Sequence, residues 1–333
     1  MNSKKKKIII IFSIIIGFIL LVAGSGLFYV NHMLSKIDRE TLNKDPDSLG
    51  IKPGVKEKIE ELQKKEKQEK SSEDKEENND IGNKKIRNIA LFGIDQEEGN
   101  AGRSDAIMIL TIDEIHKKIK LSSIMRDSYV NIEGRGMDKI NHAYAFGGAQ
   151  LALKTINSNY DLNIEDFVTV NFTTLPKIID TLGGVEITIK DYEVPLLRKV
   201  GIESAGTYNL TGKQALAYSR IRYVGNGDYE RTERQRKVLD QVFSKLIKLN
   251  ITEIPGVMAE LLPMVKTNLT NGEILDLAQT VLGLGLSKLE QQRFPLDGYC
   301  NGKMLNGIWY LMFDQEATVE QMYSFIFEDK AIN

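Results

Sequence analysis

The stretch Ile89-Ala-Leu-Phe-Gly-Ile-Asp95 is an apolar run that ends in a carboxylate, and a second apolar run, Ala106-Ile-Met-Ile-Leu-Thr-Ile112, begins directly after Asp105. Apolar runs of this length, bounded by polar residues, are typical of buried strands. Ile119-Lys-Leu-Ser-Ser-Ile124 follows the second run after a polar turn, which indicates a hairpin. These stretches predict the centre of a β-sheet with two carboxylates at the strand ends.

Helical and extended patterns alternate downstream of these strands. The predicted helices are Gly148 to Asn157, Thr174 to Leu182, Thr211 to Tyr218 and Asp228 to Leu249, and the predicted strands are Phe167 to Phe172 and Val185 to Ile189. Beyond Asn250 we expect mostly helix, with an extended piece at Arg293 to Leu296 and with Trp309 in the core. Strands interleaved with helices predict one α/β or α+β domain.

The N-terminal part of the chain predicts a membrane anchor. Ile8 to Val30 contains no charged residue, and at about 1.5 Å per residue a helix of this length crosses a bilayer core of about 30 Å. Lys4 to Lys7 precede it, so the positive-inside rule places residues 1–7 in the cytoplasm and the rest of the chain outside. A cleaved signal peptide is the alternative, but the apolar run resumes at Leu27, which favours a single uncleaved transmembrane helix over residues 8–30.

Residues 31–85 are predicted to be a juxtamembrane segment followed by a charged linker. Between Lys52 and Lys85 lysine and acidic residues dominate and aromatic residues are absent. Such a composition does not bury enough apolar surface to offset the entropy lost on ordering. We therefore expect a solvated tether, with the extracytoplasmic domain spanning residues 86–333.

Charge and cysteine content exclude several classes of protein. The formal net charge of this 333-residue chain is −2, which argues against a nucleic-acid partner bound through bulk positive charge. The single cysteine, Cys300, excludes an internal disulfide framework and a cysteine-rich zinc site. His32, His116 and His142 lie far apart, so a histidine-based metal site is not expected. We interpret His142 as a hydrogen-bonded structural residue.

Arginine is concentrated in one part of a chain that otherwise prefers lysine. Between Arg220 and Arg236 there are several arginines and no lysine. A guanidinium group makes paired hydrogen bonds to phosphate or carboxylate oxygens, so this cluster indicates anion recognition. The alternative is an ordinary solvated helix face, on which Asp228 caps the helix and Glu230 and Glu233 pair with the arginines.

The strand-end carboxylates Asp95 and Asp105 are candidate metal ligands. Mg²⁺ typically takes one or two carboxylates and completes its shell with water and phosphate oxygens. Two loop aspartates at this spacing are also common as simple turn residues, and that alternative stays open. Arg126-Asp127, at the end of another predicted strand, is either a surface ion pair or part of the same site.

Several motifs, taken in order, resemble the LytR-CpsA-Psr family. They are Phe92-Gly-Ile-Asp95, Arg103-Ser-Asp105, Arg126-Asp127, Lys139-Ile-Asn-His-Ala-Tyr144 with Gly147-Gly148, Gly183-Gly184-Val185, Leu210-Thr-Gly-Lys-Gln-Ala-Leu216, Arg220-Ile-Arg222 and Asp228-Tyr-Glu-Arg231-Thr-Glu-Arg-Gln235. The resemblance covers roughly Ile86 to Leu249, together with the N-terminal anchor. Two positions depart from the family pattern, because Met125 stands in place of the usual proline and Ala106 in place of the usual threonine.

The resemblance implies an α/β/α sandwich in which a mixed sheet and its flanking helices enclose a polyprenyl tail. It also implies a membrane-anchored extracytoplasmic phosphotransferase. Such an enzyme moves a glycopolymer (teichoic acid, capsule or another wall polysaccharide) from a polyprenyl-pyrophosphate carrier to peptidoglycan, with Mg²⁺ or alternatively Mn²⁺.

The resemblance also implies a role for each site residue. The metal ligands are Asp95 and Asp105, the pyrophosphate is held by Arg126, Arg220, Arg222 and Gln235, and the groups at the reacting phosphate are Arg103, Arg231 and Asp228. Asp228 is either a general base or an orienting residue.

Two other functions use the same residues. The domain could be a non-catalytic module that binds polyprenyl phosphate or a wall polymer, or a pyrophosphatase of the lipid carrier in which water replaces the acceptor hydroxyl. All three functions require that the arginines and carboxylates converge on one diphosphate beside an apolar tunnel.

Overall fold

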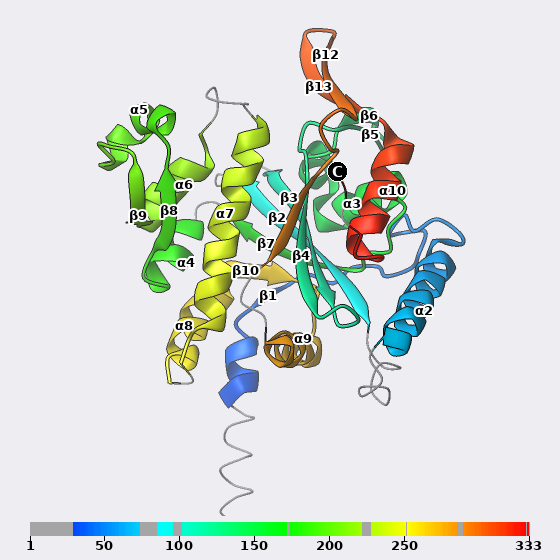
Figure 1. Ribbon diagram of the computed structural model, residues 1–333, viewed down its shortest axis with the longest axis horizontal. Helices are drawn as coiled ribbons and strands as arrows, with labels where there is room; N and C mark the ends of the chain where they lie inside the picture. Colours follow the sequence, from blue (N-terminus) through cyan, green and yellow to red (C-terminus); the bar gives the residue numbers. More distant parts are fainter. Residues whose placement is uncertain are drawn as a thin grey trace, which may run out of the picture.

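The computed structural model describes residues 29–73, 85–95, 102–171, 174–221, 228–250, 252–285, 289–330 and 332. Its centre is a seven-stranded sheet with the strand order β1-β10-β7-β2-β3-β4-β11 (Figure 1). The strands are β1 (Asp38–Arg39), β2 (Ile86–Asp95), β3 (Arg103–Asp113), β4 (Lys118–Ile124), β7 (Asp166–Asn171), β10 (Val265–Thr267) and β11 (Glu290–Phe294). The sheet is mixed, as predicted, because β1–β10, β2–β7 and β4–β11 pair in parallel and the other neighbours pair antiparallel.

Helices cover both faces of this sheet. One face packs against α2 (Val55–Glu73), α3 (His142–Tyr160) and α10 (Gln315–Ile326), and the other packs against α7 (Asp228–Ile247) and α9 (Asn271–Leu284). Side chains alternate along β2, so Ala90 and Phe92 enter the core of the first face while Leu91 packs on the second. The predicted α/β architecture with a mixed sheet between helices is confirmed.

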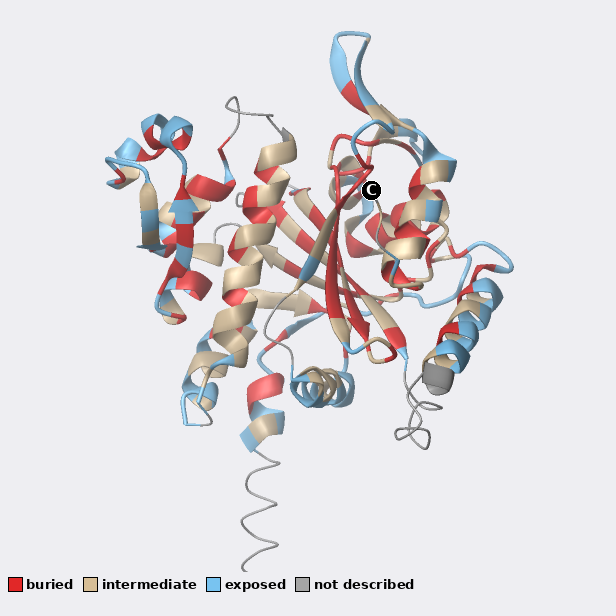
Figure 2. Cartoon of the chain, in the orientation of Figure 1, coloured by how far each residue is buried: buried red, intermediate tan, exposed pale blue. Residues whose placement is uncertain are grey.

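A smaller lobe packs on the far side of α7. It contains α4 (Leu175–Thr181), β8 (Val185–Ile189), η2 (Asp191–Glu193), α5 (Val194–Leu197), η3 (Arg198–Val200), β9 (Gly206–Leu210), α6 (Gly212–Ser219), α8 (Ile254–Leu261) and η4 (Leu262–Met264). The lobe has its own apolar core, to which α7 contributes Val238 and Val242. Figure 2 shows these buried residues along β8 and its neighbours, separate from those of the central strands. Helix α7 therefore joins the two cores.

Two small hairpins stand at one end of the sheet. They are β5 (Tyr129–Ile132) with β6 (Gly136–Lys139) and β12 (Cys300–Leu305) with β13 (Ile308–Phe313). The mostly helical prediction beyond Asn250 is wrong for β10, β12 and β13, while the extended piece near Arg293 is confirmed as β11. Strands β10 and β11 pair with strands that lie far earlier in the chain, and local periodicity does not report such pairing. Trp309 is 38% exposed on β13 and is not a core residue.

The charged segment that precedes β2 packs against the domain. Leu49, Val55 and Ile59 are buried in the core that lies between the sheet and α3. Lys52 Nζ lies 2.6 Å from Asp161 Oδ1, at the end of α3. The prediction of a solvated tether is therefore wrong for the described part of this segment. Its apolar residues are few, but helical spacing gathers them on one stripe, which average composition does not reveal.

An ionic network joins α2 to the turn between β3 and β4. His116 Nδ1 lies 2.7 Å from Asp113 Oδ2, and His116 Nε2 lies 3.1 Å from Glu66 Oε2. Lys120 Nζ, which is also buried, lies 2.9 Å from Asp113 Oδ2. Burial alone would lower the pKa of His116, but its interactions with Asp113 and Glu66 outweigh burial and raise the pKa above its usual value.

We expect His116 to stabilise the protein more at pH 6 than at pH 8. Because folding raises its pKa, its contribution is fully present below the unfolded value of about 6.5 and is lost as the pH rises through the folded value. His116→Gln should lower the free energy of unfolding by about 1–3 kcal/mol at pH 6 and by less at pH 8, measured by urea titration. Exposed His32→Gln is the control. Equal losses at both pH values for His116→Gln would contradict the expectation.

The predicted transmembrane helix lies, up to residue 28, outside the described residues. Within the described ranges, no helix combines the length and the apolar composition that a membrane crossing requires. Residues 29–34 are helical and lie at the α8 and α9 end of the domain (Figure 1), where Asn271 Nδ2 donates a hydrogen bond to Asn31 Oδ1 at 3.1 Å.

Candidate functional site

A β-bulge at the ends of β2 and β3 positions the second predicted carboxylate. Gly93 pairs with Ala106 and Ile94 pairs with Ser104, so Asp105 is the extra residue on β3. A bulge interrupts the strict alternation of side chains and re-aims the residue that it inserts. Asp105 therefore departs from the regular alternation of side chains near the N-terminal end of β3.

Asp105 lies between two arginines from different elements. Arg126 Nη1, just after β4, donates to Oδ1 at 3.0 Å, and Arg231 Nη2, in the first turn of α7, donates to Oδ2 at 2.8 Å. Burial alone would raise the pKa of Asp105, but the charges and hydrogen bonds of Arg231 and Arg126 outweigh it and lower the pKa to about 2. The carboxylate is therefore ionised at any physiological pH, with both arginines held beside it.

Asp95 pairs with an arginine in a more open setting. Arg220 Nη2, at the C-terminal end of α6, donates to Asp95 Oδ1 at 2.6 Å. The exposed fractions of the two side chains are 43% and 45%. An ion pair this exposed contributes little to stability, so Arg220 can exchange the carboxylate for another anion at small cost.

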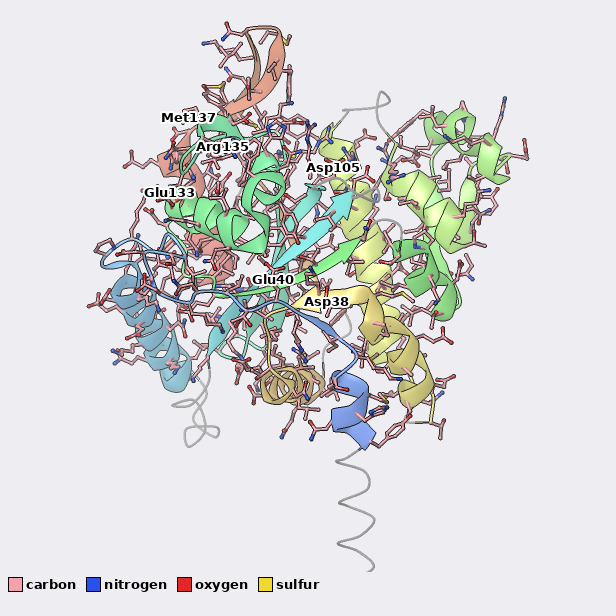
Figure 3. All side chains as sticks on the ribbon, turned by 180° about the vertical axis from the view of Figure 1, so that it is seen from behind. Asp38, Glu40, Asp105, Glu133, Arg135 and Met137 are labelled. Carbon is pink, nitrogen blue, oxygen red and sulfur yellow. The ribbon has the colours of Figure 1, made fainter. Side chains whose placement is uncertain are left out.

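Two pockets share the carboxylate pair, which we define as Asp95 and Asp105. The first, here the α6 pocket, has a volume of about 570 Å³ and a cationic lining of Lys199, Lys213, Arg220 and Arg231. The second, here the β6 pocket, has a volume of about 370 Å³ and is otherwise lined by Arg103, Arg126, Asp127, Lys139, Asn141 and His142. Figure 3 shows Asp105 between the β5–β6 hairpin, where Arg135 and Met137 lie, and the smaller lobe. Both pockets are suited to anionic ligands because of their basic side chains.

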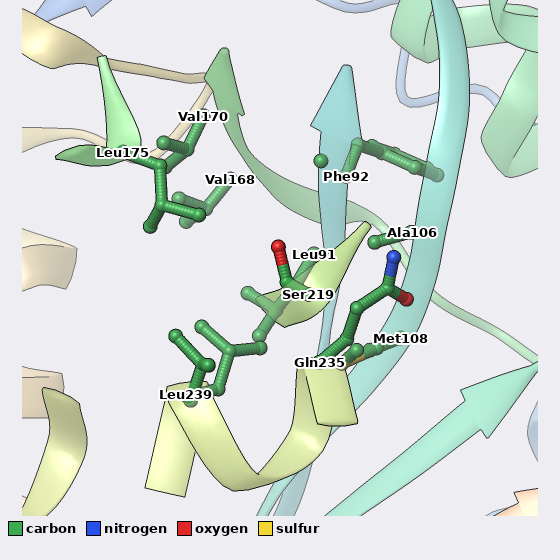
Figure 4. A pocket seen from close by; sticks show the side chains of 12 residues that line it. Leu91, Phe92, Ala106, Met108, Val168, Val170, Leu175, Ser219, Gln235 and Leu239 are labelled. Carbon is green, nitrogen blue, oxygen red and sulfur yellow. The ribbon is translucent and has the colours of Figure 1, made fainter. Parts of the chain in front are cut away.

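An apolar cavity of about 190 Å³ lies between the sheet and α7 (Figure 4). Its apolar lining is Leu91, Phe92, Ala106, Met108, Val168, Val170, Leu175, Val238 and Leu239. Cavities of about 150 Å³ with such linings stay dry and accept apolar ligands. Ser219 and Gln235 also line this cavity, and the buried Gln235 Nε2 has no hydrogen-bond partner among the described residues.

This polar part of the cavity adjoins the α6 pocket. Ser219 immediately precedes Arg220, and Gln235 follows Arg231 by about one helical turn, and both arginines line the α6 pocket. An apolar compartment therefore meets a cationic one, an arrangement that matches an amphiphile with an apolar tail and an anionic head.

The structure brings most of the predicted site residues together. The residues that line the two pockets are Asp95, Arg103, Asp105, Arg126, Arg220 and Arg231, and Gln235 lines the adjoining cavity. Arg222 lies outside the described residues. Asp228 is the first residue of α7, but the structure does not describe its side chain. Arg126 also approaches Asp127, with Nε 3.3 Å from Oδ2, so this sequence pair is an ion pair at the site itself.

The arginines of α7 divide between two roles. Arg234 Nε lies 2.6 Å from Glu193 Oε1 and its Nη2 lies 2.7 Å from Glu230 Oε2, so Arg234 is a buried structural cation of the lobe. Arg231 turns instead to Asp105. The solvated-face alternative is therefore wrong for both of these buried arginines, although the predicted pairing of Glu230 with an arginine is correct.

Sequence reasoning missed four polar residues of the pockets. They are Lys139, Asn141, Lys199 and Lys213. Lys139, Asn141 and Lys213 lie within motifs that carried the family resemblance, which was an available signal. Lys199 lies in the short helical segment after α5, and no local pattern distinguishes it from a surface lysine.

The two departures from the family pattern leave the charges of the site intact. Ala106 lines the apolar cavity, so a methyl group stands there in place of a hydroxyl. Met125 is buried, and its sulfur accepts a hydrogen bond from Thr232 of α7 at 3.4 Å. Both positions therefore affect packing around α7 rather than the polar chemistry.

The carboxylate pair is suited to a divalent cation whose other ligands are phosphate oxygens and water. Among the described residues there is no cluster of three or more His, Cys, Asp or Glu side chains that could hold a metal ion. Two carboxylates beside basic pockets are nevertheless a donor set that Mg²⁺ uses when phosphate oxygens and water complete its shell.

Comparison with known proteins identifies the family. The chain matches the LytR_cpsA_psr family over residues 54–325. It is 31% identical over 322 residues to the polyisoprenyl-teichoic acid–peptidoglycan teichoic acid transferase TagU of Bacillus licheniformis, a match that covers 95% of this chain and 94% of that protein. The chain belongs to the LytR_cpsA_psr family, which confirms the resemblance seen in the motifs.

Solved structures agree with this assignment. The structure of TagT bound to LI-WTA matches with a TM-score of 0.61 and 30% identity, covering 74% of this chain and 91% of that one. The structure of the LytR-CPS2A-psr family protein YwtF (TagT) with bound octaprenyl pyrophosphate lipid matches with a TM-score of 0.57 and 28% identity, covering 72% and 90%.

Proposed function

We propose that the protein is an extracytoplasmic phosphotransferase that moves a teichoic acid or related wall glycopolymer from a polyprenyl-pyrophosphate carrier to peptidoglycan. The observation that carries this proposal is the apolar cavity adjoining the arginine- and lysine-lined α6 pocket, which suits a lipid diphosphate. The name of the TagU relative and the octaprenyl pyrophosphate bound by TagT support it.

Catalysis in such a site depends on positioning and charge. An acceptor hydroxyl attacks the phosphorus that carries the glycan, and negative charge develops on the non-bridging oxygens and on the departing polyprenyl phosphate. Fixed cations that stabilise this charge lower the barrier without a protein nucleophile. In this proposal Arg103 and Arg231 bind the reacting phosphate. The remaining diphosphate oxygens are bound by Arg126, Arg220, Arg222 and Gln235. Asp228, at the start of α7, is a general base or an orienting residue.

A divalent cation completes the proposed site. Asp95 and Asp105 would hold Mg²⁺, with Mn²⁺ as the alternative, together with diphosphate oxygens of the donor. When bound, the cation neutralises charge on the transferred phosphoryl group. Asp105 is suited to this role because its low pKa keeps it ionised.

The lipid donor requires that the domain work beside a bilayer. The apolar residues 8–30 would form the single membrane anchor, with residues 1–7 in the cytoplasm and the domain outside. The proposed partners are therefore the membrane, the lipid-linked glycan and the peptidoglycan acceptor, with no nucleic acid.

A product assay separates this function from its two alternatives. Full-length protein in detergent is supplied with a polyprenyl-pyrophosphate-linked glycan, peptidoglycan and Mg²⁺. We expect polyprenyl phosphate to be released and the acceptor to be labelled in equal amounts. Lipid phosphate release with no acceptor labelling would indicate a pyrophosphatase, and donor binding with neither product would indicate a binding module.

Metal removal gives an independent prediction. EDTA should reduce transfer on the order of 10²-fold, because the negative charges of the carboxylate pair and the diphosphate would then repel each other without a cation to offset them. Added Mg²⁺ should restore the rate, and Mn²⁺ tested at the same concentration shows whether it can substitute. Full transfer in the presence of EDTA would mean that the arginines act alone.

A further inference from the structure

The carboxylate pair divides the site into two sides. The α6 pocket, on one side, is built by η3, α6 and α7 and adjoins the apolar cavity, whereas the β6 pocket, on the other, is built by the residues after β4, by β6 and by the start of α3. Asp105 lies between these two groups of elements (Figure 3). A lipid tail in the cavity therefore places its phosphates on the α6 side.

Phosphoryl transfer needs access from both sides. The attacking oxygen and the leaving oxygen lie roughly in line with phosphorus, on opposite sides of it. If polyprenyl phosphate departs on the α6 side, the hydroxyl must approach from the β6 side. The β6 pocket is large enough for this, with a volume of about 370 Å³, and its lining is polar.

The β6 pocket contains a histidine that is oriented by a carboxylate. His142 Nδ1 lies 2.8 Å from Asp138 Oδ2, and Asp138 belongs to β6. Burial alone would raise the pKa of Asp138, but hydrogen bonds from His142 and from the backbone N–H of Lys139 outweigh it and lower the pKa. An ionised carboxylate at Nδ1 favours the tautomer that carries its proton there, which leaves Nε2 as a proton acceptor.

Two hairpins extend the β6 pocket into a longer surface. The backbone N–H of Leu311 donates to Asp127 O at 2.9 Å, and Lys139 Nζ lies 5.7 Å from the ring centre of Tyr310, so β13 touches two residues of the pocket. The exposed apolar side chains on these hairpins are Met137, Met304, Ile308 and Trp309. A polymeric acceptor extends beyond a pocket of about 370 Å³, and such a surface is available to the units next to the reacting one.

We infer that the β6 pocket is the subsite for the acceptor sugar and that His142, oriented by Asp138, is the general base for its hydroxyl, which leaves Asp228 the orienting role. This inference rests on the proposed transferase function. His142 Nε2 takes the hydroxyl proton while the acceptor oxygen bonds to the phosphorus that carries the glycan. The bond from that phosphorus to the bridging oxygen breaks, and the electron pair leaves on polyprenyl phosphate. The products are the phosphodiester-linked acceptor, polyprenyl phosphate and protonated His142.

The test compares His142→Gln with His32→Gln in full-length protein, since His32 is exposed and lines neither pocket. General-base catalysis is worth on the order of 10²–10⁴-fold, so His142→Gln should lower transfer by that factor, while binding of octaprenyl pyrophosphate stays unchanged. The pH–rate profiles of the wild type and His142→Gln should differ, because glutamine cannot accept the hydroxyl proton. The other charged groups around His142 are Asp95, Arg103, Asp105, Arg126, Asp127, Asp138 and Lys139.

Two further variants separate a chemical role from a structural one. Added imidazole should restore part of the transfer rate of His142→Ala, and Asp138→Asn should shift the pH profile with a smaller loss of rate. Wild-type transfer with an unchanged rate and pH profile in His142→Gln would overturn the inference, as would a loss of octaprenyl pyrophosphate binding in that variant. Absence of transfer in the wild type would instead contradict the proposed function.

Discussion

Asp105→Asn should reduce glycopolymer transfer on the order of 10²–10³-fold, the loss typical when one charge-stabilising group is removed from an active site. Asparagine keeps the shape of the side chain but not its charge. It therefore supplies neither an ionised ligand for a cation nor the negative charge that offsets Arg126 and Arg231. Because both arginines donate hydrogen bonds to this carboxylate, their hold on the donor should weaken as well. The rate is measured as labelled acceptor formed per enzyme.

The control for this prediction is a carboxylate paired with an arginine elsewhere on the domain. Asp276 Oδ2 lies 2.5 Å from Arg87 Nη1, near the opposite end of β2, and the Asp276 side chain is exposed. Asp276→Asn should transfer at the wild-type rate, and circular dichroism should show both variants folded. Equal rates for Asp105→Asn and the wild type would remove the carboxylate pair from the mechanism.

Ala106→Leu should weaken binding of octaprenyl pyrophosphate at least roughly 10-fold, because one misplaced methylene in an apolar pocket already changes discrimination by roughly 10–200-fold and leucine adds three carbon atoms. Ala106 lines the cavity near Gln235, and a leucine there occupies space that the lipid tail requires (Figure 4). Binding of inorganic pyrophosphate should stay unchanged, because the added side chain lies in the apolar cavity rather than in the α6 pocket. Isothermal titration with both ligands measures the two effects separately.

Ala278→Leu is the matched control, because it adds the same side chain at an exposed position of α9. It should bind both ligands like the wild type. If Ala106→Leu binds the lipid normally and keeps its melting temperature, the tail does not enter this cavity. Loss of inorganic pyrophosphate binding as well would indicate that the substitution distorts the cationic pocket.

The central strands and the major helices could be predicted because their signals are local. The apolar runs that became β2 and β3 and the amphipathic pattern that became α7 are visible in short windows. The motifs with their charged residues also identified the family, and six of the predicted charged site residues line two adjoining pockets. The roles assigned to Arg222 and Asp228 stay predictions.

Other features of the fold and of the site could not be predicted from short stretches of sequence. A few apolar residues on one stripe were enough for α2 to pack, although the segment around it is dominated by charge. The bulge at Asp105 arises from the register between two strands, which neither strand encodes alone. His142 had the appearance of a structural residue until its place in the β6 pocket, with Asp138 beside it, was known.

The amino-acid sequence by itself determined which segments are buried strands and which side chains are available to bind a diphosphate, because periodicity and side-chain chemistry are properties of short stretches. Only the tertiary structure decided that Arg231 meets Asp105 while Arg234 meets Glu193, and that the carboxylate pair has a pocket on each side. Arg231 and Asp105 are 126 positions apart, and the attraction between two charges depends on their distance in space and on burial. Both are fixed when the sheet and α7 pack together.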